Sequence, residues 1–138
     1  MTIEEIQKEI IDEFGFFEDW DDKYRHIIDM GKELAPFPED HRNDEYRVRG
    51  CQSQVWLYPV VENGTIRFYA DSDALIVKGL ISLLLRVYSG HTPQEIKNSE
   101  LIFIDQVGLG THLSPTRSNG LAAMLKQIRY YAVAMEGR

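Results

Sequence analysis

Two short segments rich in β-branched and aromatic residues, separated by an Asn-Gly pair, limit the folds open to this chain. Residues 55–58 are Val-Trp-Leu-Tyr, residues 65–69 are Thr-Ile-Arg-Phe-Tyr, and Asn63-Gly64 lies between them. An Asn-Gly pair favours the tight turn of a β-hairpin, because both residues tolerate a positive φ. We expect a small antiparallel sheet of about three strands, with residues 46–48 as the short third strand. Pro59 cannot donate a ladder hydrogen bond, so its strand should lie at an edge or contain a bulge.

Helical patterns precede this hairpin. Thr2 and Glu5 have the spacing of a capping box, which predicts an amphipathic helix that ends near Gly15. A second helix is expected from residues 18–19 to just before Pro36, because the residue before a proline avoids the helical conformation. The proline-punctuated segment that follows is predicted to be an ordered surface loop.

Further helices are predicted after the hairpin. The acidic segment 71–73 supplies candidate N-cap residues for a helix that starts near Ala74, and Gly90 is placed to end it. Residues 92–95, Thr-Pro-Gln-Glu, form a second capping box and predict a short helix. Residues 102–113 carry no clear pattern.

The last helix should begin at Ser114-Pro115. It carries an apolar stripe typical of core packing: Leu121, Met124, Leu125, Ile128, Ala132 and Met135. These elements together predict an α+β fold in which helices pack against a small antiparallel sheet.

Length and charge narrow the class of protein. The 138 residues, 43% of them hydrophobic, suit one domain over residues 1–138. A net charge of -7 disfavours nucleic acids and anionic membranes, since binding to phosphates depends on Lys and Arg. The apolar run at residues 74–88 is shorter than the roughly 20 residues that span a bilayer. The acidic N-terminal residues do not resemble a secretory signal, so we expect a cytoplasmic protein.

Cys51 is the only cysteine, and it lies in Arg49-Gly50-Cys51-Gln52-Ser53-Gln54. A structural cysteine behaves as a small hydrophobe, but the neighbours here are polar and a glycine precedes it. Arg47 and Arg49 could favour the thiolate, the nucleophilic form. The residues alone leave a reactive thiol and an inert one equally open. A lone cysteine excludes an internal disulfide, an all-cysteine zinc site and a CxxC couple.

Other polar residues give weaker signals. No two of the four histidines have the i, i+4 spacing of a helical metal pair, so we expect no metal site. We also expect no bound cofactor. Asp71 and Asp73 could act as paired carboxylates, although helix capping explains them better. Arg117 falls in the first turn of its predicted helix, where a cation opposes the macrodipole. Such a placement can hold an anion, or it can be an exposed arginine tolerated at small cost.

Three segments taken together resemble the SufE family over nearly the whole chain. They are residues 50–56 (Gly-Cys-Gln-Ser-Gln-Val-Trp), residues 71–80 (Asp-Ser-Asp-Ala-Leu-Ile-Val-Lys-Gly-Leu) and residues 114–121 (Ser-Pro-Thr-Arg-Ser-Asn-Gly-Leu). The helix that carries Trp20 and Tyr24 is also similar to the second helix of that family. Thr116 stands where many relatives have serine, which preserves the hydroxyl.

The resemblance implies a sulfur acceptor with the fold shared by SufE and IscU-type proteins. A SufS-type cysteine desulfurase, which carries pyridoxal phosphate, would pass persulfide sulfur to Cys51 and be stimulated by the transfer. Iron–sulfur scaffold proteins would receive the sulfur next. The resemblance also implies roles in loop positioning or partner contact for Gly50, Gln52, Ser53 and Asp73, and a loop or anion contact for Arg117. We expect the Cys51 loop to rest against apolar side chains and to become exposed on docking.

Two other functions remain open from the residues. A cysteine-nucleophile hydrolase or transferase would need a histidine within reach of Cys51 to activate the thiol. A plain binding module would make the cysteine incidental. The carrier needs no such histidine, so the surroundings of Cys51 distinguish the three.

Overall fold

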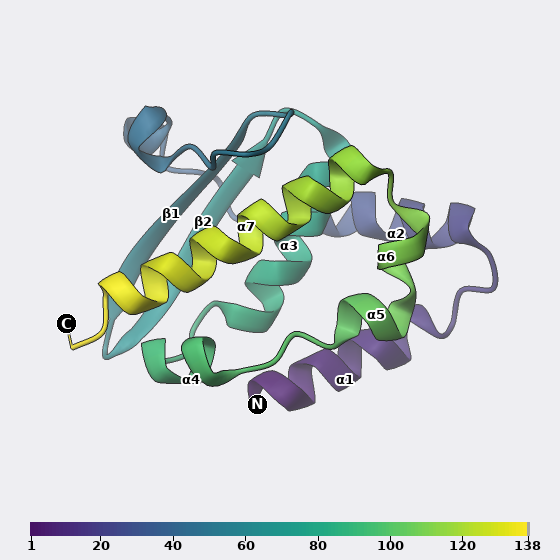
Figure 1. Ribbon diagram of the computed structural model, residues 1–138, viewed down its shortest axis with the longest axis horizontal. Helices are drawn as coiled ribbons and strands as arrows, with labels where there is room; N and C mark the ends of the chain where they lie inside the picture. The colour runs from purple at the N-terminus through teal and green to yellow at the C-terminus, as the bar shows by residue number, and fades with distance from the viewer. Residues whose placement is uncertain (138) are drawn as a thin grey trace.

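The computed structural model describes residues 1–137 and has the predicted α+β architecture, with helices packed around one antiparallel hairpin (Figure 1). Two helices precede the hairpin: α1 (Ile3–Phe14) and α2 (Trp20–Lys32). The strands are β1 (Val55–Glu62) and β2 (Thr65–Ser72). The later helices are α3 (Leu75–Tyr88), α4 (Pro93–Asn98), α5 (Phe103–Val107), α6 (Leu109–His112) and α7 (Pro115–Ala134). Figure 1 shows α7 crossing the view in front of α3.

The hairpin forms as the sequence predicts. The register runs without a bulge from Val55 opposite Ser72 to Glu62 opposite Thr65. Asn63 and Gly64 form the turn with φ of 51° and 79°, the left-handed values that a two-residue hairpin turn requires. Pro59 therefore lies in a strand at the edge of a two-stranded sheet, as expected for a residue without an N–H group.

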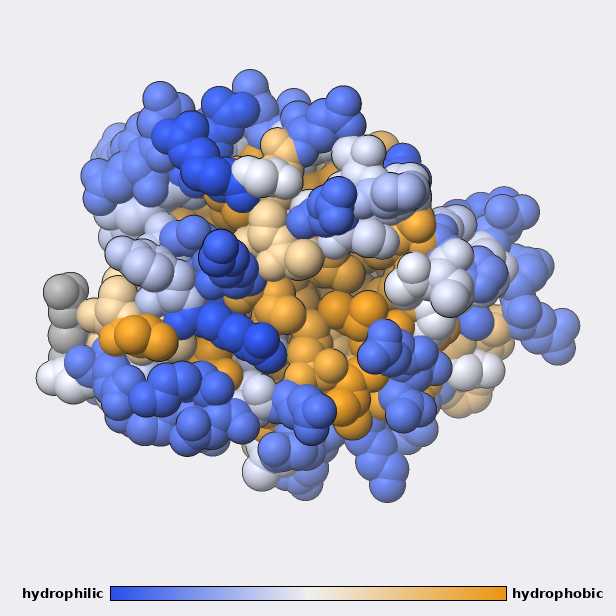
Figure 2. All heavy atoms as spheres, in the orientation of Figure 1, coloured by the Kyte–Doolittle hydropathy of each residue, from blue (hydrophilic) through white to orange (hydrophobic). Residues whose placement is uncertain are grey.

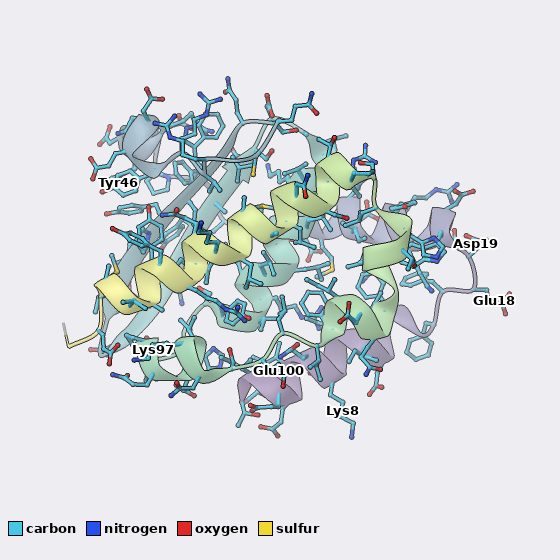
Figure 3. The ribbon with its side chains drawn as sticks, viewed as in Figure 1. Lys8, Glu18, Asp19, Tyr46, Lys97 and Glu100 are labelled. Atoms are coloured by element: carbon cyan, nitrogen blue, oxygen red, sulfur yellow. The ribbon has the colours of Figure 1, made fainter. Side chains whose placement is uncertain are left out.

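The predicted third strand is reduced to a single bridge. Arg47 pairs with Trp56 alone, and the N–H of Val48 donates to the carbonyl of Val55 at 2.8 Å. The preceding residues Asp44–Tyr46 form a 3₁₀ turn that the side chain of Asn43 caps, so they are not available for strand pairing. Aromatic side chains cover this edge instead: Tyr46, labelled in Figure 3, lies edge-on to Tyr58.

The N-terminal helices begin where their capping residues predict. Thr2 and Glu5 form the reciprocal capping box of α1, and Asp19 caps α2. Helix α2 packs closely on α3 where Gly31 meets Gly79. The helices are so close that a Cβ on Gly79 would lie only 2.1 Å from the carbonyl oxygen of Ile27. Helix α3 forms the centre of the hydrophobic core, with ten of its fourteen residues buried.

The start of α3 differs from the prediction. Its N-cap is Ala74, which makes no side-chain capping bond, although residues 71–73 offered three candidate caps. Asp71 binds Arg42 and Lys78 instead, and Asp73 binds the backbone of Gln54. Both carboxylates therefore have tertiary partners, in the earlier loops and, for Asp71, also at Lys78 of α3, and neither of them caps the N-terminus of α3.

The C-terminal half of the chain completes the hydrophobic core with α4 to α7. The second capping box, at Thr92 and Glu95, opens α4 as predicted, and the segment without a pattern contains α5 and α6. Four residues of the predicted α7 stripe are buried and the other two are half-buried: Leu121, Met124, Ile128 and Ala132, then Leu125 and Met135. Apolar side chains also gather on the face in Figure 2, where an open groove between α7 and α5–α6 is lined by Ile104 and Leu125.

Among residues 1–137, no helix combines the length and apolar character that a membrane crossing requires. Within the same residues, His, Cys, Asp and Glu side chains form no group of three or more suited to a metal ion.

Candidate functional site

The loop of residues 49–54 carries Cys51 from the Arg47 bridge into strand β1. Gly50 has a φ of 89°, a conformation that L side chains rarely adopt, which lets the chain turn sharply before the cysteine. A Cβ at Gly50 would lie 3.3 Å from the Cβ of Ala123 on α7. The turn is therefore pressed against α7, and glycine is needed there for both its φ and its size.

The Cys51 side chain is half-buried and points to α7. Its Sγ–H donates to the backbone carbonyl of Gly120, with the sulfur 3.6 Å from the oxygen. Burial raises the pKa of the Cys51 thiol. Their position in sequence suggests that Arg47 and Arg49 favour the thiolate, but the pKa of Cys51 shifts in the opposite direction. The resting thiol is thus a protonated group packed against the core.

An open pocket of about 410 Å³ adjoins Cys51. Three segments that are distant in sequence line it: the Cys51 loop, the start of α3 and the first turns of α7. Its lining combines an apolar wall with hydroxyl groups and one cation: Cys51, Gln52, Ser53, Ala74, Ile76, Val77, Ser114, Thr116, Arg117, Gly120 and Met124. The expectation that the loop rests against apolar side chains agrees with this arrangement.

Arg117 lines the same pocket as the cysteine. Its backbone N–H donates to the Ser114 hydroxyl at 3.3 Å, which fixes the first turn of α7, while its side chain is exposed. Within residues 1–137 its guanidinium makes no ion pair. A cation in the first turn of a helix opposes the macrodipole, and here it is the charged group of the pocket lining.

The other predicted residues divide into two groups. Gln52 and Ser53 line the pocket directly. Asp73 does not line it, but Oδ1 of Asp73 accepts a hydrogen bond from the backbone N–H of Gln54 at 3.0 Å. Asp73 therefore ties down the far end of the Cys51 loop, and the paired-carboxylate interpretation of Asp71 and Asp73 has no support because each binds a different partner.

None of the four histidines lines the Cys51 pocket, and each has contacts elsewhere. His26 is 2.8 Å from a Glu13 carboxylate oxygen, and His91 is 3.1 Å from the Met1 carbonyl oxygen. His41 stacks on Tyr58 and His112 stacks on Trp20. The histidine that a cysteine hydrolase needs is therefore missing from the cysteine's surroundings in the described part of the chain.

Gly120 and Met124 are pocket residues to which the sequence assigned no function. Gly120 lies within the segment 114–121, and the apolar stripe of α7 predicts core packing for Met124. Their helical spacing from Arg117 places all three on one side of α7. That spacing was the available signal, but nothing in the sequence indicated that this side faces Cys51.

Comparison with known proteins connects these features to a family. The model of a family described as "SufE: Fe-S metabolism associated domain" matches residues 8–132. An uncharacterized SufE-like protein of Rhizobium meliloti is 41% identical over 135 residues, which cover 94% of each chain. A second uncharacterized SufE-like protein, from Rhizobium etli, is 44% identical over 126 residues, 88% of this chain and 85% of that protein. The solution structure of a hypothetical protein from Thermus thermophilus superposes with a TM-score of 0.77 at 22% identity, covering 94% of each chain, which shows a shared fold.

Proposed function

This chain belongs to the SufE family, and from that membership we propose that it is a sulfur carrier whose Cys51 accepts persulfide sulfur from a cysteine desulfurase. The family description places the chain in iron–sulfur metabolism. The proposed donor is a cytoplasmic SufS-type enzyme, which the transfer would stimulate. The proposed recipients are iron–sulfur scaffold proteins. Residues 1–138 would act as one sulfur-acceptor domain.

One observation carries the proposal: the only cysteine of the chain lies at the wall of an open pocket whose lining, within residues 1–137, contains a cation and no histidine or carboxylate. A hydrolase would need a base at this point to activate its nucleophile. A sulfur carrier does not, because its partner can supply the activated sulfur. The surroundings of Cys51 therefore favour transfer between proteins over catalysis by this chain alone.

The proposed transfer is an exchange between a persulfide and a thiol. Cys51 loses its proton to solvent, and its sulfur attacks the terminal sulfur of the partner's persulfide. The partner's S–S bond breaks as a new S–S bond forms at Cys51, and the partner cysteine leaves as a thiolate that takes up a proton. One thiol and one persulfide give one persulfide and one thiol, so no oxidant or reductant is consumed. The rates follow the rules of thiol–disulfide exchange.

The pocket offers a place for the added sulfur. Its apolar wall, which includes Ile76 and Val77, would shelter the persulfide from water-borne reductants. The Arg117 guanidinium at the same pocket would stabilise an ionised terminal sulfur. The lone cysteine also suits a carrier, since a second thiol nearby would attack the persulfide and release sulfide.

Mass spectrometry tests this function directly. The protein is incubated with a SufS-type desulfurase, pyridoxal phosphate and cysteine, and then mapped by peptide mass. We expect one added sulfur on the peptide that contains Cys51, and a faster desulfurase turnover. Cys51→Ser, checked by circular dichroism for an intact fold, should neither gain sulfur nor stimulate the enzyme. Equal stimulation by wild type and Cys51→Ser would show that the thiol does not carry the sulfur.

A further inference from the structure

An apolar groove lies between α7 and the α5–α6 segment, on a different side of α7 from the cysteine pocket. Its walls include Ile104 from α5 and Leu121 and Leu125 from α7, and its volume is about 200 Å³. Ala122 lines the groove at an exposed position. Figure 2 shows apolar side chains gathered on this face with hydrophilic residues around them. An open apolar surface with a polar rim is typical of a protein-interaction site.

A half-buried cation lies beside one end of this groove. Arg129 follows Leu125 by four residues, so the two share one side of α7. Burial raises the pKa of the Tyr88 hydroxyl, and Ser99 and Arg129 oppose this rise, so both side chains lie close to the hydroxyl. Within residues 1–137 Arg129 makes no ion pair. Its Nε and the Tyr88 hydroxyl are both buried without a hydrogen-bond partner.

The charge of Arg129 indicates what the groove binds. Burial of a charge is costly unless an opposite charge or hydrogen bonds compensate for it. Opposite charges attract more strongly in such surroundings than in bulk water, and a guanidinium can bind a carboxylate through two parallel hydrogen bonds. An apolar groove with this arginine at its end therefore matches a protein segment that carries apolar side chains next to a carboxylate.

The groove is close enough to the cysteine pocket to belong to the same interface. Gly120 and Met124 line the pocket, while the next residues of α7, Leu121 and Leu125, line the groove. An α-helix with its side chains is about 10–12 Å wide. A standard protein interface buries about 800 Å² on each partner, which corresponds to a disc of roughly 16 Å radius. An interface of that size centred on Cys51 covers the groove as well.

We propose that the groove between α7 and α5–α6, with Arg129 at its end, is a second contact site for the cysteine desulfurase and receives apolar side chains and an adjacent carboxylate of that enzyme. The inference rests on the proposed function for the identity of the partner. The groove and the cysteine pocket share no lining residue. The groove therefore sets how tightly the enzyme binds, whereas the sulfur exchange itself takes place at Cys51.

The test compares the same substitution at two exposed positions of α7. Ala122→Glu places a carboxylate in the groove, and Ala134→Glu places one about 18 Å farther along the helix, outside the groove lining. Binding to a SufS-type desulfurase that holds pyridoxal phosphate is measured by isothermal titration calorimetry. We expect the Kd of Ala122→Glu to rise at least tenfold, because a charge then faces apolar side chains and a carboxylate. Ala134→Glu should stay within twofold of wild type.

Turnover assays separate binding from sulfur exchange. Ala122→Glu should need a correspondingly higher concentration for half-maximal stimulation of the desulfurase and should reach the wild-type maximal rate. Arg129→Gln tests the carboxylate contact on its own. The Kd of this variant, with its fold checked by circular dichroism, should rise about threefold to tenfold and depend less on salt than that of wild type. Arg129→Lys, which keeps the charge, should bind more tightly than Arg129→Gln.

Two outcomes would overturn the proposal. The first is an Ala122→Glu protein with an intact circular dichroism spectrum that binds the desulfurase within twofold of wild type. The second is a wild-type dimer in analytical ultracentrifugation that Ala122→Glu abolishes while the desulfurase affinity stays the same, since the groove would then bind a second copy of this chain.

The sulfur-loading assay separates this inference from the proposed function. Weaker binding of Ala122→Glu, together with no sulfur on Cys51 in the wild type, would support the groove contact and refute the carrier function. Sulfur on Cys51 in the wild type, together with unchanged binding of Ala122→Glu, would refute the groove contact and leave the carrier function intact.

Discussion

Gln54 and Asp73 hold each other through a reciprocal pair of hydrogen bonds. The Gln54 N–H donates to Oδ1 of Asp73 at 3.0 Å, and the Asp73 N–H donates to the Gln54 carbonyl at 3.3 Å. This pair ties the end of the Cys51 loop to the entrance of α3, while Gly50 ties its beginning to α7. The loop is thus held on both sides of the cysteine.

Substitution of Asp73 should free the end of the loop. Asp73→Ala removes the acceptor for the Gln54 N–H, whereas Asp73→Asn keeps an oxygen at the same place. We expect faster hydrogen exchange at Gln54 and faster Cys51 alkylation in Asp73→Ala. The loss of stability should be at most about 1 kcal/mol, because the bond is solvent-exposed. Near-wild-type behaviour of Asp73→Asn is the control. A loop that is unchanged in Asp73→Ala would contradict the assigned role.

Substitution of Arg117 should weaken sulfur transfer more than folding. Arg117 is exposed and its side chain forms no ion pair within residues 1–137, so Arg117→Ala should shift the unfolding free energy by less than about 0.5 kcal/mol. The rate of sulfur loading onto Cys51 should fall severalfold, because the pocket loses its cation. Lys126→Ala, which removes an exposed cation farther along α7, should leave the rate unchanged. Matching losses of stability and transfer in Arg117→Ala would identify the residue as structural.

Two glycine-to-alanine substitutions should have opposite effects on stability. At Gly79 a Cβ would lie 2.1 Å from the Ile27 carbonyl oxygen, so Gly79→Ala must push α2 and α3 apart and should cost about 3 kcal/mol or more. At Gly120 the new Cβ has room, so Gly120→Ala should stabilise the protein by about 0.5–1 kcal/mol through the helix propensity of alanine. Denaturant unfolding measures both changes. A stable Gly79→Ala protein would refute the close α2–α3 packing.

Asp71 should contribute stability that depends on pH. Burial alone would raise the pKa of Asp71, but hydrogen bonds from Arg42, the Ser72 N–H and Lys78 outweigh it and lower this pKa below the ordinary 3.8. Since the pKa is lower in the folded state, the stabilisation is present above the ordinary pKa and is lost as pH falls through the folded value. Asp71→Asn should therefore be less stable than wild type by about 1–2 kcal/mol at neutral pH.

The same comparison repeated in acid provides the control for Asp71. The stability gap between Asp71→Asn and wild type should narrow as pH falls below 3.8, because the wild-type carboxylate then takes up a proton. A gap of constant size across that range would show that Arg42 and Lys78 do not stabilise the ionised carboxylate.

Local features of the sequence were sufficient to predict most elements of this fold. The capping boxes at Thr2 and Thr92 involve residues three positions apart, and the turn at Asn63-Gly64 depends on the φ preferences of two neighbours. Residue types alone predict a third strand, and the structure has a single bridge between Arg47 and Trp56 in its place. The prediction that residues 71–73 cap α3 was wrong for another reason. The Asp71 and Asp73 carboxylates bind Arg42 and Gln54, which lie in earlier loops.

The sequence by itself determined that one thiol, at a glycine-preceded turn, would carry any cysteine chemistry of this protein. Only the tertiary structure decided the state of that thiol. Arg47 and Arg49 are neighbours in sequence, yet the sulfur lies against Gly120, which is 69 positions away. The electrostatic environment of a side chain depends on distance in space and on burial. Three separate segments meet to form the pocket around Cys51. The reactivity of Cys51 therefore follows from how the chain packs.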